Sequence, residues 1–302
     1  MTRPGPARSV QSLGAVSAAL ALLMLAAWAS NSDASSSAKT VSQTPPAEIG
    51  AKDFDSASFA RPTDVDSKWF PQKPGMRLVF RGTTTEGKER VPHRVVFTVT
   101  DLTKTIAGVR NVVMWERDYS AGELSEAEIA FFAQDDDGNV WQLGEYPEEY
   151  EAGKIVASPL WIHGLQGAKA GLAMRAVPRT GTPSYSLGWG PAIGFNDRAK
   201  VLRIGQKDCV PHGCYENVLV TDEYNPDEPG KHQLKYYARG VGNIRVGWAG
   251  KNEDTKETLA LVVVDRLGSK AMAQARAAAR RLEASAYERR KAYRKTPPLE
   301  RG

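Results

Sequence analysis

The chain has 302 residues, of which 41% are hydrophobic and 25% charged, with two cysteines and a formal net charge of +5. This composition excludes a coiled coil, a collagen-like fibre, a polytopic membrane protein and a disulfide-dense miniprotein. The charge is unevenly placed, since residues 1–29 carry +2, residues 270–302 carry +7 and residues 30–269 carry −4. An acidic body with a basic tail argues against a nucleic-acid-binding domain, whose positive charge would lie on the fold itself.

The amino terminus has the three parts of a secretory signal. Arg3 and Arg8 precede an apolar run at residues 14–27, and Ala27-Trp28-Ala29 supplies small residues at a cleavage site. The run is shorter than the ~20 residues that usually span a bilayer. We therefore predict that residues 1–29 are a signal peptide and that the protein is periplasmic, bound in the cell envelope or secreted. An uncleaved amino-terminal membrane anchor is the alternative.

Residues 30–68 have the composition of a linker. They are rich in Ser, Ala, Thr, Asp and Pro, and their few large apolar residues have no period. Such a segment buries too little apolar surface to offset the entropy lost on ordering. The sequence predicts a disordered linker here.

Residues 69–265 read as a β-rich domain. Short β-branched and aromatic segments alternate with turn residues, and several show one apolar and one polar face, as Val95, Phe97 and Val99 do. This pattern is typical of antiparallel sheets, and no helical stretch long enough for a parallel crossover separates the segments. The predicted class is all-β, with a strongly curved antiparallel sheet, open barrel or sandwich. The expected strands are residues 77–81, 94–100, 106–117, 128–134, 140–144, 154–158, 184–189, 200–206, 216–223, 233–239, 243–249 and 258–264.

Residues 266–302 are predicted to form a basic carboxy-terminal helix and tail. The stretch 270–295 is rich in Ala, Arg, Glu and Leu, and its apolar residues recur at spacings of three and four until Pro297 and Pro298 end the pattern. Either the helix packs on the domain, or its basic surface attracts an anionic lipid, polymer or partner. The residues available for that contact are Arg276, Arg280, Arg281, Arg289, Arg290, Lys291 and Arg294.

The two cysteines lie in one short segment. Pro211 and Gly213 make the residues between Cys209 and Cys214 a natural hairpin loop, which would bring the two thiols together. In an exported chain a disulfide is the default. A metal site using both cysteines and His212 is the alternative, and it is cramped and lacks a fourth ligand.

Two acidic clusters are read as structural. Residues 135–139, Asp-Asp-Asp-Gly-Asn, lie between apolar runs and predict a tight turn, with calcium binding as the alternative. Glu145, Glu148 and Glu149 are read as a solvated loop. We predict no metal site and no cofactor.

No catalytic set is recognisable. The four histidines lie in no nucleophile motif, G-x-S-x-G is absent, and a glycine-rich phosphate loop has no support. Acidic residues together with Trp141, Trp161 and Trp189 would suit a carbohydrate-active enzyme, but nothing in the sequence pairs them.

Three stretches together resemble an uncharacterised family of exported bacterial β-rich proteins. They are residues 69–75 (WFPQKPG), residues 131–145 (from FFAQD through GNVW to GE) and residues 236–242 (YYARGVG), the last preceded by ENVLVT at residues 216–221. The chain has Phe131-Phe132 where the family usually shows Trp-Tyr, and its cysteine pair and basic helix look like additions. The resemblance implies a signal peptide followed by one β-rich domain, and it implies no reaction.

The sequence therefore favours an exported, non-enzymatic β domain that binds a partner, an apolar ligand or a glycan in the concave face of its sheet. Trp141, Trp161 and Tyr237 are the candidate ligand-binding residues. The alternatives are a cell-envelope hydrolase acting on glycan and a structural envelope protein whose basic helix is its contact surface. No nucleic-acid partner is expected.

Overall fold

The computed structural model describes residues 54–302, so the predicted signal peptide and residues 30–53 of the predicted linker lie outside the described residues. Sixteen strands form one antiparallel sheet that is not closed, and one α-helix, α1 (Ser269–Arg289), follows them in the described part of the chain. The predicted fold class is confirmed. No helix among residues 54–302 is long and apolar enough to cross a membrane.

The sheet runs in the order β10-β8-β5-β4-β3-β2-β1-β15-β14-β13-β12-β11-β9. The strands are β1 (Met76–Glu86), β2 (Glu89–Ile106), β3 (Val109–Ser120), β4 (Glu123–Gln134), β5 (Val140–Glu151), β6 (Lys154–Ala157), β7 (Trp161–Ile162), β8 (Lys169–Met174), β9 (Tyr185–Ser186), β10 (Gly188–Trp189), β11 (Arg198–Val210), β12 (Gly213–Tyr224), β13 (His232–Ala238), β14 (Gly242–Ala249), β15 (Thr258–Arg266) and β16 (Glu300–Arg301). Most neighbours in the order are also neighbours in sequence, because short turns join successive antiparallel strands.

The predicted strand at residues 106–117 begins at the wrong residue. The chain turns at Ala107-Gly108, where both residues have positive φ (48° and 82°), so that β2 ends at Ile106 and β3 begins at Val109. Two-residue hairpin turns of this kind need positive φ at both central positions, and glycine adopts that conformation without strain. The two-residue turn was missed because apolar residues flank it on both sides.

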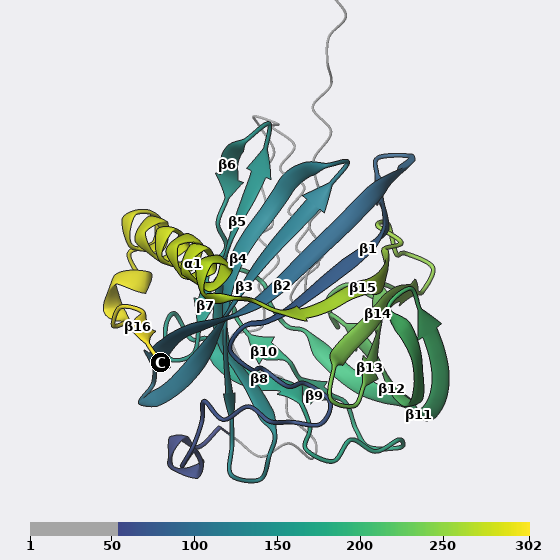
Figure 1. Ribbon diagram of the computed structural model, residues 1–302, viewed down its shortest axis with the longest axis horizontal. Coiled ribbons are helices and arrows are strands. Elements are labelled where there is room, and N and C mark those ends of the chain that lie inside the picture. The colour runs from purple at the N-terminus through teal and green to yellow at the C-terminus, as the bar shows by residue number, and fades with distance from the viewer. Residues whose placement is uncertain (1–53) are drawn as a thin grey trace, which may run out of the picture.

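The sheet curls round one apolar cluster and carries a second. Phe97 and Met114 from β2 and β3 pack in the same cluster as Leu219 and Ile244 from β12 and β14, on the far side of the sheet order. This cluster therefore lies on the inner face. The second cluster contains the opposite face of β2–β5 together with the buried side of α1, and it continues to β7–β10. Figure 1 shows α1 against β4 and β5, with β11–β14 curling round on the other side of the molecule.

Residues 54–68, which the sequence assigned to the disordered linker, are part of the fold. Val65 is fully buried in the inner cluster, and the ring of Phe54 lies 5.7 Å from that of Trp141. The peptide N–H of Ser67 donates to the side chain of Gln134. These contacts explain why a polar segment with few apolar residues is ordered: each of those residues has a place on the sheet.

The basic tail packs on the outer face. Ala275, Ala279, Leu282 and Ala286 form the buried side of α1, as the predicted spacing requires. The helix ends at Arg289 rather than at residue 295, and a short 3₁₀ turn, η2 (Tyr293–Lys295), follows it. β16 then pairs with β2 and returns the carboxy terminus to the sheet.

A buried ion pair fixes this helix. Lys104 of β2 donates from Nζ to Glu283 of α1 at 2.7 Å, and its ammonium lies 4.2 Å from the ring centre of Tyr293. Glu283 also accepts the peptide N–H of Leu299. The early end of the helix allows Tyr293 to turn back and cover the pair. The carboxy-terminal segment is therefore a packed part of the domain.

Candidate functional site

The inner face of the sheet divides into an apolar end and a polar end. Along β3 the inward side chains run from Val112 and Met114 to Glu116 and Asp118, because alternate residues of a strand share a face. On β4 the corresponding run goes from Phe132 and Ala130 to Glu128 and Glu126, which pair in register with those of β3.

The three stretches that carry the family resemblance meet at the apolar end. Phe70 from the first stretch lies 5.3 Å from the ring of Phe132 in the second and 6.4 Å from that of Tyr237 in the third. The peptide N–H of Gly240 donates to the carbonyl of Lys68. At least 55 residues of chain separate one stretch from the next, so their meeting defines one end of the curved sheet as a candidate site.

A pocket opens to solvent at this end. Its inner wall is made by Leu78, Phe97, Val99 and Met114, from the inner face of β1–β3. Its mouth is made by the first and third stretches and by the residues beside them: Phe70, Pro71, Gln72, Met76, Val241, Gly242 and Asn243. The pocket is mostly apolar with a few polar groups, which is the usual make-up of a small-molecule site.

Two buried amides line the pocket. Gln72 is 6% exposed and Asn243 is 4% exposed, and the side-chain oxygen of each has no hydrogen-bond partner among the described residues. A buried acceptor without a partner costs about 1–3 kcal/mol. Both therefore favour a ligand that brings a hydrogen-bond donor to the mouth of the pocket.

The polar end holds a cluster of buried carboxyl groups, here called the inner acid cluster: Glu116, Asp118, Glu126, Glu128 and Glu145. Burial, followed by the charges of neighbouring acids, raises the pKa values of Glu116 and Glu128 well above the usual range. Burial also raises the pKa of Glu145 to about 8. Lys235 of β13 faces all three of these glutamates across the interior and opposes the rise.

Glu116 is the extreme member of the cluster. Its side chain is 0% exposed, and neither carboxyl oxygen has a hydrogen-bond partner among residues 54–302. It lies directly opposite Phe97 in the β2–β3 register, and Phe97 lines the pocket. Glu116 is therefore next to the pocket wall but does not itself line the pocket.

A buried histidine, His93, contacts two acids at the polar end of the inner face. His93 Nε2 lies 2.7 Å from Asp118, and Nδ1 lies 3.5 Å from Glu257. Burial disfavours the charged imidazole, but the hydrogen bond to Asp118 and the charges of both acids outweigh it and raise the pKa of His93. Burial raises the pKa of Glu257 to about 8.

No group of three His, Cys, Asp or Glu side chains in residues 54–302 is close enough to hold a metal ion. The Asp135–Asn139 segment forms the tight turn that the sequence predicted, between β4 and β5. Asp135 accepts hydrogen bonds from the Asn139 peptide and from the Trp141 indole, so its carboxylate is engaged in the turn.

The solvated loop predicted for residues 145–149 is wrong. Glu145 and Glu148 are 1% and 3% exposed and belong to β5, with Glu145 in the inner acid cluster. Glu148 lies on the other side of the strand and accepts hydrogen bonds from Tyr146 and Tyr150.

The three predicted ligand-binding aromatics are not brought together. Tyr237 is buried in the inner cluster, with its hydroxyl 3.4 Å from Glu223, whereas Trp141 and Trp161 are buried in the second cluster. Trp141 donates its indole N–H to Asp135, and Trp161 packs on Phe195 at 4.9 Å. Ligand binding by these residues stays a prediction.

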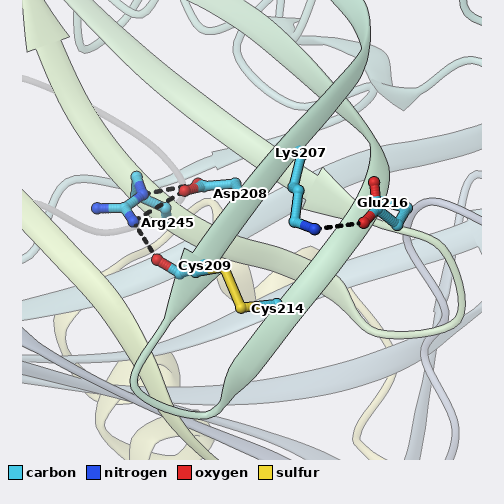
Figure 2. Close-up of a disulfide and its surroundings, with 6 residues drawn as sticks. All are labelled: Lys207, Asp208, Cys209, Cys214, Glu216 and Arg245. Atoms are coloured by element: carbon cyan, nitrogen blue, oxygen red, sulfur yellow. Dashed lines mark hydrogen bonds and ion pairs between the residues drawn. A yellow bond between two sulfur atoms is a disulfide. The ribbon is translucent and has the colours of Figure 1, made fainter.

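The cysteine segment forms the hairpin and disulfide that the sequence predicted. Cys209 and Cys214 pair in register at the ends of β11 and β12 and are covalently joined. Figure 2 shows the disulfide joining the two strands. Arg245 donates hydrogen bonds to Asp208 and to the Cys209 carbonyl on one side of it, and Lys207 forms an ion pair with Glu216 on the other. The disulfide therefore closes the β11–β12 hairpin at an exposed position.

Comparison with known proteins adds two distant structural similarities. No family model matches the chain, and no curated protein matches it significantly. A protein from Bacteroides fragilis described as exported and as having a YmcC-like fold is 12% identical, with a TM-score of 0.38, over 66% of this chain and 100% of that one. A protein from Parabacteroides distasonis described as a lipoprotein is 12% identical, with a TM-score of 0.32, over 66% of this chain and 99% of that one.

Proposed function

We propose that this protein is an exported, non-enzymatic β domain that binds a ligand inside its curved sheet. The observation that carries the proposal is the solvent-open, mostly apolar pocket at which Gln72 and Asn243 bury side-chain oxygens that have no partner in the described chain. Export is supported by the composition of residues 1–29, and ligand binding by the residues of the inner face.

The stability cost of the inner acid cluster supports a functional role. A neutral carboxyl group that is buried without a hydrogen-bond partner lowers the stability of the fold by about 1–3 kcal/mol. A buried apolar side chain at position 116 would avoid that penalty. Residues that cost stability and sit beside a pocket are typical of binding sites.

A native mass spectrum of the protein purified from its own exported compartment tests this proposal. We expect the mass of residues 30–302 plus a reproducible excess that leaves on denaturation. Val241→Phe, at the half-buried mouth of the pocket, should abolish the excess, whereas Val263→Phe on exposed β15 should retain it. A bare mass for the wild type, or an excess that survives Val241→Phe, would contradict binding in this pocket.

The glycan hydrolase is a second candidate, favoured by one observation. Several carboxyl groups converge at the polar end, and burial holds the pKa of Glu145 at about 8, as a general acid requires. Release of reducing sugar from envelope glycan that is lost in both Glu145→Gln and Glu128→Gln would support it. Intact glycan after prolonged incubation, together with a bound ligand in the mass spectrum, would favour binding alone.

We also propose that the exposed basic side of α1 contacts an anionic envelope surface. Arg276 is engaged by Asp101 through two hydrogen bonds, while Arg280, Arg281, Arg289, Lys291 and Arg294 are exposed. Because α1 is fixed to the sheet through Glu283, these charges sit on a rigid surface. Charge reversal at Arg280 and Arg281 should reduce envelope retention, and unchanged retention would overturn this contact.

A further inference from the structure

We propose that the outer face of β1–β3 binds a flexible linear polymer that carries phosphate groups. The contact is made by three arginines on neighbouring strands, here called the outer arginine patch: Arg81 of β1, Arg94 of β2 and Arg117 of β3. This inference rests on the contact with an anionic envelope surface proposed above for α1, because it names the chemistry of that partner and adds a second surface to the contact. It does not depend on the interior pocket.

The strand register places the three arginines side by side on one face of the sheet. Arg81 lies directly opposite Arg94, and Arg94 lies directly opposite Tyr119. Arg117 precedes Tyr119 by two residues and so shares its face. Directly opposed residues have Cβ atoms about 5 Å apart, diagonal neighbours lie about 7–8 Å apart, and like charges at such positions destabilise a sheet. The arrangement therefore costs stability unless an anion lies between the charges.

The outer arginine patch has no carboxylate partner. On the same face, Arg77 donates from Nε to Asp265 at 2.9 Å. None of the ion pairs formed within residues 54–302 involves an arginine of the patch. Burial lowers the pKa of Arg117, and the positive charges of Arg94 and Arg77 lower it further. An anion at the patch would therefore relieve a repulsion that the fold leaves uncompensated.

Two aromatic rings hold the guanidinium groups in place. The guanidinium carbon of Arg117 lies 4.0 Å from the ring centre of Trp115, and that of Arg94 lies 5.1 Å from the ring centre of Tyr119. An arginine that stacks on an aromatic ring has less freedom to lose when its N–H groups bind an anion. The Nε of Arg117 is buried and has no hydrogen-bond partner in the described chain. The patch therefore presents ordered donors, one of which is already out of water.

The close spacing of the guanidinium groups favours phosphate over carboxylate. A single guanidinium group engages both oxygens of a carboxylate in one planar, bidentate pair. The oxygens of a phosphate group point toward the corners of a tetrahedron, so two adjacent guanidinium groups can each bind a different oxygen. Arg81 and Arg94, which are directly opposed, are suited to share one such group.

A flexible chain fits this face better than a flat surface does. The ion pair between Lys104 and Glu283 holds α1 on the same face, and Trp115 is partly buried against the cluster that contains the buried side of α1. Figure 1 shows β2–β4 continuing past α1 to their hairpin ends. A helix with its side chains is about 10 Å across, so a bilayer that rests on α1 is held off the sheet. A linear chain can follow the sheet beside the helix and contact both.

Isothermal titration of the full exported chain with three probes tests the inference. The probes are a short inorganic polyphosphate, polygalacturonate and vesicles of phosphatidylglycerol, which present phosphate on a chain, carboxylate on a chain and phosphate on a flat bilayer. We expect polyphosphate to bind about tenfold more tightly than polygalacturonate at equal concentration of charge. Binding should weaken as salt is added.

Three variants separate the patch from general attraction between opposite charges. Arg94→Gln should weaken polyphosphate binding about tenfold, and Arg94→Lys should recover little of that loss, because lysine keeps the charge but lacks the planar fork. Arg179→Gln, at an exposed arginine between β8 and β9, makes the same change in net charge and should weaken binding by less than about twofold. Urea unfolding should find Arg94→Gln at least as stable as wild type, since it removes one of the repelling charges.

The outcomes distinguish this inference from the contact proposed for α1. Loss of polyphosphate binding in Arg280→Glu with Arg281→Glu, but not in Arg94→Gln, would overturn the patch and leave the helix contact. Equal binding of polygalacturonate, or equal effects of Arg94→Gln and Arg179→Gln, would overturn phosphate recognition by the patch. Vesicle binding that is lost in Arg94→Gln would show that a flat bilayer reaches the patch and would overturn the polymer. No binding of any probe would overturn the patch and the helix contact together, whereas the interior ligand is tested separately by the native mass spectrum.

Discussion

Two of the buried glutamates have opposite surroundings, Glu283 on the outer face of the sheet and Glu116 on the inner face. Glu283 receives the ammonium of Lys104 and the peptide N–H of Leu299, and Tyr293 covers the pair. Glu116 receives no hydrogen bond within the described chain and faces four other acids. Both carboxyl groups are excluded from water, so burial alone does not explain the difference.

The difference shows which buried charges hold the fold together. A buried charge contributes to specificity only when its partners satisfy it, whereas an unsatisfied one weakens the fold. The outer pair joins the last helix to β2 and so has a structural reason to exist. The inner glutamate has no such partner in the described structure, and for that reason we propose a functional role for it.

The largest expected effect is at the outer pair. Glu283→Gln or Lys104→Met should lower the free energy of unfolding by about 3–5 kcal/mol, because each leaves a buried charge without its partner. The double variant Lys104→Met with Glu283→Leu should recover much of that loss. Urea unfolding at pH 7 measures all three, and losses that simply add in the double variant would show that the pair is not coupled.

The inner face should make stability fall as pH rises. Glu145 and Glu257 have folded-state pKa values of about 8, above the ordinary value near 4.5, so the folded chain holds protons that the unfolded chain releases. Their contribution is present below pH 4.5 and is lost between pH 4.5 and 8. The raised pKa of His93 acts in the same direction from its ordinary value near 6.5 upwards.

Between pH 4.5 and 8, each carboxyl group with a raised pKa lowers the free energy of unfolding by about 1.4 kcal/mol per pH unit. Glu145→Gln should therefore flatten the pH dependence of the unfolding free energy between pH 5 and 8. Glu151→Gln should leave it unchanged. A stability that rises from pH 5 to 8 would contradict the account of the inner face.

The smallest effect is expected at the solvent-facing edge of the outer contact. Arg276 pairs with Asp101 through two hydrogen bonds, but the two side chains are 24% and 21% exposed, so salt screens the pair. Arg276→Gln should lower stability less than any change at Glu283, and the loss should shrink in 0.5 M salt. A loss as large as that of Glu283→Gln would mean that the helix is held chiefly by its exposed edge.

The sequence predicted the strands well where one face is apolar and the other polar. Val95, Phe97 and Val99 gave β2 its inward side, and the spacing in α1 gave its buried side. It could not predict that β2 continues to Ile106, since a bulge between Val99 and Thr103 breaks the alternation. The bulge redirects the strand under α1, where Lys104 meets Glu283.

The inner acid cluster was missed for a related reason. In β3, Glu116 alternates with Trp115 and Arg117, and the pattern alone places the glutamate in solvent. Because α1 and the second cluster cover the outer face, the side of β3 that the pattern assigned to solvent is the interior of the curved sheet. The available signal was the set of inward residues on β3, where Met114 is followed by two acids, and it can be interpreted only once the sheet is known to curl round this face.

The unfolding free energy of Glu116→Gln against wild type at pH 7, in the absence of ligand, tests most directly whether Glu116 weakens the fold. We expect the variant to be more stable, by about 1–3 kcal/mol, because an amide needs no protonation in the folded state. The gain should vanish as the pH falls toward 4.5. A variant that is less stable than wild type at pH 7, as Glu283→Gln is expected to be, would show that Glu116 is a structural partner and would contradict the interior binding site.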